Sequence, residues 1–452
     1  MKKLLCLCFL TILCIPINAQ VPEVCFGDYK TGEWGDWNII EYSEADKEIY
    51  AFLDEFGFNL IRFDTDFNIK VQTKTKIKSG TILSVRKGNS HIDVITEKGQ
   101  DIMHYTFDSN SLQNISSENL FRLPNMNFYN KEYFTEVCWS ANGQFLGIVA
   151  CVFPKDPGVS YTDYMYYMYL YDKDFHLLNH VEFPYMQHKI GTKKFSRPTW
   201  TITDNGELVY AALHVTTKPK KYPEYGESGC MMDVSIITKD NVKKQKATNI
   251  DPGGCMYDVF LYAAGNIAKY DGKQMQVFIA NTLYQYNLID NTVLPLCTFK
   301  YYQQATSMTG LSSYINDGEG GYAMNSGRGW TWIKAEPLKS ICGGWGSAYV
   351  QQGNALFFPR RDAYSSQVTF FYKNKLYHID NINTERFVSR KYKLTQLLCI
   401  DETGVGSTIE IKSNAKNDLQ FYQLSENRFL VWERNAKIEK KYMQRLGFFG
   451  LK

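Results

Sequence analysis

The stretch CWSANGQFLGIVAC, residues 138–151, contains the clearest turn signal in the chain. Asn142 and Gly143 lie between two apolar runs, and an Asn-Gly pair in this position is typical of a β-hairpin because both residues tolerate the positive φ of a type I′ turn. With a two-residue turn, Cys138 faces Gly147, and Cys151 lies about 13 Å further along the strand. A disulfide between Cys138 and Cys151 is therefore excluded.

A second hairpin follows this one. After a loop come an apolar run from Met165 to Tyr171, the polar stop Asp172-Lys173-Asp174, and a return strand through Val181. Residues 138–183 thus contain four expected strands in about 45 residues, which is the length of one β-propeller blade.

The same phrase, an apolar or aromatic strand followed by an Asp- or Asn-containing stop and a second strand, recurs along the chain. Its copies are marked by Asp64, Asp108, Asp172, Asp240, Asp290 and Asp380, and by residues 421–430. The gap between the last two Asp has room for one more degraded unit near residues 330–340. Such units cannot bury their faces alone, so they stack in a ring. The sequence predicts an all-β fold, a β-propeller of four-stranded antiparallel blades, with seven blades preferred and six to eight allowed.

Two motifs resemble known propeller repeats. Residues 139–143, Trp-Ser-Ala-Asn-Gly, resemble the Trp-Ser-Pro-Asp-Gly phrase of TolB-type and WD-type repeats, with Ala and Asn in place of Pro and Asp. Residues 49–68 resemble the NHL-type repeat, with its Ile-Tyr opening strand and aromatic-Asp stop. The resemblance implies a propeller and says little about activity.

The N-terminus has the pattern of a secretory signal peptide over residues 1–19. Lys2 and Lys3 form a basic head, residues 4–15 an apolar core, and Asn18-Ala19 a small-residue exit. We expect residues 20–36 to form an N-terminal segment and residues 37–452 a single propeller domain. No later stretch is apolar and charge-free for the ~20 residues of a spanning helix, so we expect no transmembrane segment. Together with the leader, this predicts an exported protein, periplasmic, cell-surface or secreted, and we expect it to be a monomer.

The charge balance argues against nucleic acid as a partner. The formal net charge is +3, and removing Lys2 and Lys3 leaves +1 because the leader holds no acid. A nucleic-acid surface needs a clear basic excess.

The chain has 11 Cys, of which eight follow the leader. Eight Cys allow 105 pairings, so sequence alone cannot assign disulfides. Most of these Cys lie in apolar, strand-like runs, where a free Cys behaves as a small buried hydrophobe. The eight are Cys25, Cys138, Cys151, Cys230, Cys255, Cys297, Cys342 and Cys399.

Catalytic and metal motifs are weak, and we predict no catalytic residue, metal site or cofactor. There is no Gly-x-Ser-x-Gly nucleophile elbow. Asp64/Asp66 and Asp172/Asp174 alternate as in calcium loops but lack the later Gly and bidentate Glu, so they are better interpreted as turn residues. The tetrapeptide at residues 121–124 resembles the aromatic-Arg-Ile/Leu-Pro phrase of sialidases, but it lies about 100 residues into the mature chain and the sialidase Asp-boxes are missing, so we interpret Arg122 as a solvated strand residue.

Two features indicate a binding role. The phrase Gly-Cys-Met-x-Asp-Val occurs twice and places Asp233 and Asp258 equivalently, where the two Asp flank a channel mouth or Cys230 and Cys255 form a bridge. A Gly-dense run over residues 317–346 is rich in Trp and Arg, which suit stacking on sugars or anchoring a protein. Its candidate residues, with one that follows, are Arg328, Trp330, Trp332, Trp345 and Arg360. The competing interpretations are chance similarity and core tryptophans.

The sequence therefore favours an exported, non-enzymatic propeller that binds a protein or a glycan through one face. The insertions at residues 154–164 and 218–228 are expected to be loops, where propellers place specificity. The alternative is a glycosidase or lyase acting at the central channel, and a structural component of an envelope complex is a third class that sequence does not separate from the first.

Overall fold

The computed structural model describes residues 23–451 apart from several segments. The omitted segments are 32–37, 54–57, 75–79, 125–133, 153–162, 187–192, 196–198, 217, 249, 251–265, 280–281, 299–314, 317–318, 320, 326–328, 335–338, 345–367, 384–392, 404–405, 416–418 and 439–440.

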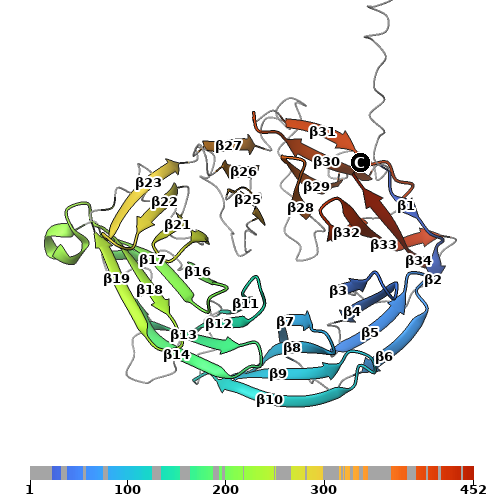
Figure 1. Ribbon diagram of the computed structural model, residues 1–452, viewed down its shortest axis with the longest axis horizontal. Helices are drawn as coiled ribbons and strands as arrows, with labels where there is room; N and C mark the ends of the chain where they lie inside the picture. Colours follow the sequence, from blue (N-terminus) through green and yellow to red (C-terminus); the bar gives the residue numbers. More distant parts are fainter. Residues whose placement is uncertain are drawn as a thin grey trace, which may run out of the picture.

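The described strands form eight antiparallel sheets arranged as the blades of a ring (Figure 1). The β-propeller fold is therefore confirmed, and eight sheets lie at the upper end of the predicted range of six to eight. The additional unit is the sheet over residues 315–344, in the gap where the sequence left room for one. In blades 1 to 3 and in blade 7 the first strand lies toward the centre of the ring and the last at its rim, whereas in blade 8 β32 lies toward the centre and the N-terminal strands β1 and β2 lie at the rim (Figure 1).

The first four blades occupy residues 38–248. Blade 1 contains β3 (Asn38–Ser43), β4 (Glu48–Leu53), β5 (Asn59–Asp64) and β6 (Ile69–Lys74). Blade 2 contains β7 (Thr81–Lys87), β8 (His91–Lys98), β9 (Asp101–Asp108) and β10 (Asn114–Arg122). Blade 3 contains β11 (Phe134–Trp139), β12 (Phe145–Val152), β13 (Asp163–Asp172) and β14 (Leu177–Met186). Blade 4 contains β15 (Lys193–Phe195), β16 (Thr199–Ile202), β17 (Leu208–Thr216), β18 (Cys230–Ile237) and β19 (Val242–Thr248).

The other four blades complete the ring. Blade 5 contains β20 (Asn266–Tyr270), β21 (Gln274–Ile279), β22 (Thr282–Asn287) and β23 (Thr292–Thr298). Blade 6 contains β24 (Ile315–Asn316), β25 (Tyr322–Asn325), β26 (Gly329–Lys334) and β27 (Lys339–Gly344). Blade 7 contains β28 (Val368–Tyr372), β29 (Lys375–Asn383), β30 (Lys393–Ile400) and β31 (Gly406–Glu410). Blade 8 contains β32 (Leu419–Ser425), β33 (Arg428–Ile438) and β34 (Lys441–Gly450), joined by β1 (Cys25–Phe26) and β2 (Lys30–Thr31).

The core lies between neighbouring blades, because each sheet is covered on both faces. In β33, Phe429 and Val431 pack in the cluster shared with blade 7, whereas Leu430 and Trp432 pack in the cluster shared with blade 1. All four side chains are fully buried. A strand sandwiched in this way must be apolar on both faces, and each such side chain contributes about 1.5–3 kcal/mol.

The N-terminal segment completes the last blade. Cys25 and Phe26 pair with Phe448 and Gly447 of β34, and a Cβ on Gly447 would lie 2.7 Å from the carbonyl oxygen of Cys25. Only glycine therefore allows this close approach. The strands β1 and β2 of the N-terminal segment are thus part of the propeller sheet of blade 8.

A buried ion pair in blade 8 also holds the N-terminal strands against β34. Arg445 Nε lies 2.6 Å from Glu433 Oε2, and both side chains are almost completely buried. The hydroxyl of Tyr29 donates to the same carboxylate oxygen at 3.0 Å, and the Arg445 guanidinium lies 3.9 Å from the ring centroid of Phe26. The N-terminal strand is therefore held by side chains as well as by its few backbone bonds.

The hairpin at residues 138–151 has the predicted register but a different turn. Cys138 pairs with Gly147, as expected. Gly143 has φ 66°, whereas Asn142 is not in the positive-φ region, and the Gly143 amide donates to the Ser140 carbonyl at 2.8 Å. The predicted type I′ turn is therefore wrong, and the geometry is that of a type I turn followed by a left-handed glycine. The Asn142 side chain instead accepts a hydrogen bond from the Gln144 amide.

Five of the predicted Asp stops, in blades 1 to 5, lie at the turns between the third and fourth strands: Asp64, Asp108, Asp172, Asp240 and Asp290. The prediction of a stop at Asp380 is wrong, because Asp380 lies inside β29 and pairs with Gln396. The stop within residues 421–430 is the turn between β32 and β33, the first two strands of blade 8.

Asp172 Oδ1 accepts hydrogen bonds at 2.9 Å from the amides of Asp174 and His176, and Phe175 between them has φ 64°. The same bonds form in blade 1 among Asp64, Asp66 and Asn68, around Phe67 with φ 63°. The interpretation as carboxylate-capped turns is confirmed.

No helix among the described residues is long and apolar enough to cross a membrane.

Candidate functional site

Three of the seven predicted ligand-binding residues lie in the described part of the chain. Asp233 is in β18 of blade 4, and Trp330 and Trp332 are in β26 of blade 6, so blade 5 separates them. The others lie outside the described residues and stay predictions: Arg328, Trp345, Arg360 and Asp258. The fold therefore does not bring Asp233 together with the two described tryptophans.

Trp332 is a core residue. Its side chain is 2% exposed and packs edge-on against Phe371 of blade 7, with ring centroids 5.1 Å apart. Lys334 Nζ lies 5.3 Å from the centroid of the same ring. A ring covered in this way offers no face to a sugar or a protein, so the expected role of Trp332 as a ligand platform is corrected to packing between blades 6 and 7. Trp330, two residues before it, pairs with Asn325 and Gly343 in the sheet.

Asp233 lies beside a lysine at the rim of blade 4. Asp233 Oδ1 is 3.9 Å from Lys246 Nζ, and their side chains are 27% and 64% exposed. Burial, together with the nearby charges of Glu224 and Asp233, raises the pKa of Tyr225 to about 12. Burial and the charge of Asp233 likewise raise the pKa of Tyr286 to about 12. Both phenols therefore stay protonated at physiological pH and can donate hydrogen bonds.

Next to Asp233, the predicted insertion at residues 218–228 joins β17 to β18. It contains two short 3₁₀ helices, η1 (Pro219–Lys221) and η2 (Pro223–Tyr225), each of which begins with a proline. Tyr225 is 3% exposed, and η2 contacts β17 and β18. We call residues 218–229 the η1–η2 loop; it projects from the rim of blade 4 (Figure 1).

The base of the η1–η2 loop is closed by a glycine. The Thr216 amide donates to the Gly229 carbonyl at 2.8 Å, and Gly229 has φ 69°. A Cβ on Gly229 would lie 2.4 Å from the Thr216 carbonyl oxygen, so no other residue fits without backbone movement. Prolines in both 3₁₀ helices, a buried tyrosine and this closed base give the loop a defined conformation.

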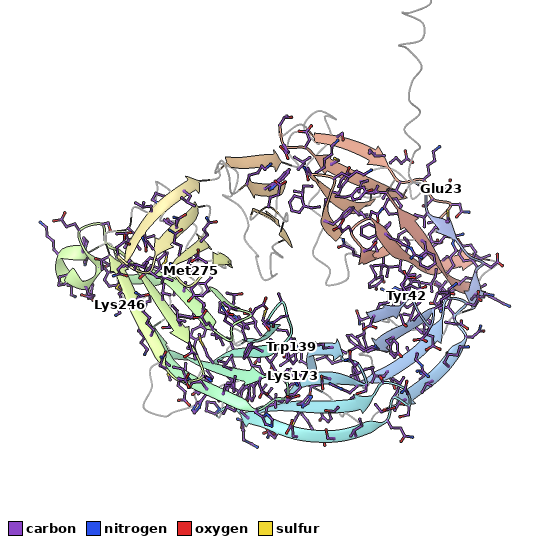
Figure 2. The ribbon with its side chains drawn as sticks, viewed as in Figure 1. Glu23, Tyr42, Trp139, Lys173, Lys246 and Met275 are labelled. Atoms are coloured by element: carbon purple, nitrogen blue, oxygen red, sulfur yellow. The ribbon has the colours of Figure 1, made fainter. Side chains whose placement is uncertain are left out.

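Near the centre of the ring, an arginine links blades 2 and 3. Arg86 of β7 places its guanidinium 4.3 Å from the ring centroid of Trp139 at the end of β11, and its Nη1 donates to the Gly143 carbonyl at 3.0 Å. Phe175 meets the same indole edge-on at 5.6 Å. Figure 2 shows Trp139 on the part of blade 3 that faces the centre. Covered by Arg86 and Phe175, Trp139 contributes to blade packing.

A histidine between two carboxylates reinforces this contact. His104 Nε2 lies 2.9 Å from Asp93 Oδ1, and its Nδ1 lies 2.9 Å from Glu118 Oε1. His91 Nε2 lies 3.1 Å from the second oxygen of Asp93, and the buried His104 ring stacks on Phe175 with centroids 3.5 Å apart. The cluster fixes blade 2 against blade 3.

Arg122 lies far from the centre of the ring. It is the last residue of β10, the outermost strand of blade 2, and its side chain is 66% exposed. Its guanidinium donates to Asp101 Oδ1 at 3.3 Å and Gln100 Oε1 at 3.2 Å. This placement fits a solvated strand residue and not an arginine that binds substrate at a central channel.

The described residues contain no group of three His, Cys, Asp or Glu placed to hold a metal ion. The thiols of Cys25, Cys138 and Cys399 are free, which agrees with the interpretation of these Cys as unpaired. Cys230 is buried at the start of β18, and Cys255 lies outside the described residues, so the suggested bridge between them stays a prediction.

Comparisons with known proteins add the following. No protein-family model and no curated protein matches the chain. Among solved structures, BamB from Moraxella catarrhalis matches with a TM-score of 0.35 and 8% identity, over 90% of this chain and 83% of that one. The WD40 domain of SCAP from fission yeast matches with a TM-score of 0.37 and 8% identity, over 96% of this chain and 93% of that one. Dipeptidyl peptidase 4 from Porphyromonas gingivalis matches with a TM-score of 0.43 and 10% identity, over 92% of this chain and 58% of that one.

Proposed function

We propose that the protein is an exported, non-enzymatic β-propeller that recognises a protein or a glycan through the face bearing the η1–η2 loop. The observation that carries this proposal is the construction of the loop. Its two prolines, the buried Tyr225 and the closed base at Gly229 hold exposed side chains in place on a rigid blade. Loops with defined conformations on rigid scaffolds are where propellers carry specificity.

Export rests on the leader pattern. The basic head at Lys2 and Lys3, the apolar run over residues 4–15 and the small-residue exit at Ala19 are typical of a cleaved secretory signal. A signal-peptide truncation and N-terminal sequencing of the secreted or periplasmic fraction test this part of the proposal. We expect a mature N-terminus close to residue 20.

Site-specific photo-crosslinking tests the binding face. A photoreactive amino acid at Tyr222, in the η1–η2 loop, is compared with one at Leu177, which is 50% exposed on the outer strand of blade 3. We expect a defined crosslinked species from position 222 in source cells and none from position 177. Crosslinks from both positions or only from position 177 would refute the assignment of the face.

A glycan-array screen with a reducing-end assay separates binding from catalysis. The mature protein is applied to the array and to the same polysaccharides in solution. Binding without new reducing ends supports recognition of a glycan, and a crosslink from position 222 without glycan binding supports recognition of a protein. Release of reducing ends would overturn the non-enzymatic assignment.

A further inference from the structure

Lysines are concentrated in residues 218–248 of blade 4, the part of the chain that includes the η1–η2 loop. Residues 218–248 contain seven Lys, no Arg and four acidic residues. All seven lysines are exposed, in a chain whose formal net charge is only +3. Three lie in the η1–η2 loop, one in the β18–β19 turn and three in the outer strand β19: Lys218, Lys220, Lys221, Lys239, Lys243, Lys244 and Lys246. Figure 2 shows Lys246 at the outer rim of blade 4.

The lysines of β19 have a structural explanation of their own. The outer strands of blades 1, 2, 3 and 5 each contain a β-bulge, whereas β19 pairs with β18 without a register shift. Lysines on a regular edge strand prevent it from pairing with other chains. The three lysines of the η1–η2 loop lie off this edge, so edge protection does not account for them.

The loop lysines are held near one another. The Lys221 amide donates to the Lys218 carbonyl at 3.0 Å, which folds the segment into a single 3₁₀ turn. Within the described residues, the ion pairs of 4.0 Å or less include none made by these three lysines, whereas Lys246 pairs with Asp233 at 3.9 Å. Three positive charges on one ordered turn attract an anionic partner and speed its association.

We infer that the η1–η2 loop, with Lys246 beside Asp233 at its base, docks an acidic segment of another polypeptide. This inference rests on the proposed binding function and names the partner class. An acidic segment supplies several carboxylates in series, each of which can pair with one lysine. Residues 218–248 contain no arginine, so the positive charge of this surface is carried by lysines, which act as mobile point charges.

The aromatic residues of the loop also favour a polypeptide over an anionic glycan. Sugars bind on open aromatic faces, and the loop contains two tyrosines. Tyr225 is buried, and Tyr222 is half-buried with Lys221 Nζ 5.5 Å from its ring centroid. Tyr225 therefore offers no ring face for stacking on a sugar, and Lys221 lies over the ring of the half-buried Tyr222.

Fluorescence anisotropy with a labelled polyglutamate peptide of about 20 residues tests the inference. We expect saturable binding to the mature protein at low salt, weakened as ionic strength rises because exposed charges are screened. The variant with Lys218→Glu, Lys220→Glu and Lys221→Glu is expected to bind about tenfold or more weakly, because three attractive pairs are replaced by repulsion. A control variant reverses three exposed lysines scattered over other blades, with the same change in net charge: Lys47→Glu, Lys98→Glu and Lys412→Glu.

The control decides between a site and a general charge effect. We expect it to bind polyglutamate within about threefold of wild type. Equal weakening of both variants, unchanged binding by the loop variant, or no binding of polyglutamate would overturn the inference. Tighter binding of heparin than of polyglutamate at equal charge, lost in the loop variant, would overturn it in favour of an anionic glycan. A crosslink from position 222 in cells together with no polyglutamate binding would leave the proposed function standing and remove only this partner class.

Discussion

Replacing Arg445 by Ala is expected to destabilise the closure of the ring. The guanidinium contacts the fully buried Glu433 at 2.6 Å, Asn414 Oδ1 at 2.7 Å, and the rings of Phe26 and Tyr29. Removing it leaves a buried carboxylate without its compensating charge, which costs about 3–5 kcal/mol. With an unfolding entropy near 2.1 cal/mol/K per residue, about 430 residues give roughly 0.9 kcal/mol/K, so Tm falls by about 4 °C if the ring unfolds as one unit.

Two measurements check this value. Thermal unfolding followed by circular dichroism gives Tm, and hydrogen exchange gives the protection of the Gly27 amide, which donates to the Leu446 carbonyl at 2.9 Å. We expect faster exchange at Gly27 in Arg445→Ala than in wild type. Faster exchange at Gly27 would show that the substitution weakens the pairing of the N-terminal segment with β34.

Controls separate the buried charge from the loss of a side chain. Arg122→Ala removes a 66% exposed arginine and should change stability by less than about 0.5 kcal/mol. The double variant Arg445→Met with Glu433→Leu removes the charge together with its partner and should recover most of the lost stability. The reasoning is refuted if Arg445→Ala lowers Tm by less than 1 °C, or if the double variant is as unstable as the single one.

Three further predictions concern other parts of the ring. Gly147→Ala places a Cβ 2.8 Å from the Trp200 ring, so we expect a loss of about 1–3 kcal/mol and a shifted tryptophan emission; an unchanged denaturation midpoint would contradict this. Burial lowers the pKa of His378 from 6.5 to about 3. As the pH falls below 6.5, the unfolded chain therefore binds a proton at this histidine before the folded chain does, and the free energy of unfolding decreases until about pH 3, by about 2 kcal/mol at pH 5. Urea titrations at pH 7 and 5 should show this loss in wild type and not in His378→Leu. Asp172→Ala removes the acceptor of two turn amides and should cost about 1–3 kcal/mol, whereas Lys173→Ala should be nearly neutral in the same titration.

Local turn chemistry made most of the fold predictable. The Asp172 stop and the Asn142-Gly143 turn each set a strand boundary within a few residues, and the register of Cys138 against Gly147 followed from the turn length. The sheet over residues 315–344 was the least visible because its β26–β27 connection, residues 335–338, contains neither Asp nor Asn nor Gly. A blade without an Asp or Asn-Gly turn can be predicted only from the length of chain left between the blades on either side of it.

Contacts between blades were not predictable from local patterns. Arg86 and Trp139 meet through side chains from two sheets, and no periodicity in either strand marks the partner. The same limit affected Trp332: in a strand covered on both faces, a tryptophan in the core and one at a surface have the same sequence context. The η1–η2 loop was expected from its Pro, Gly and Lys content, but the burial of Tyr225 that orders it was not.

The bond between Tyr29 and Glu433 joins residues 404 positions apart in the chain. A contact of this separation closes almost the whole polypeptide into one loop, and its closure entropy is offset only when the intervening blades bring the two ends together. If the chain crosses a membrane from its N-terminus, β1 and β2 cross first, but their partner strand β34 crosses last. Until β34 is available, β1 and β2 stay exposed, and the interval before closure is when the unfinished ring is open to proteases, chaperones and exchange of strands with another copy.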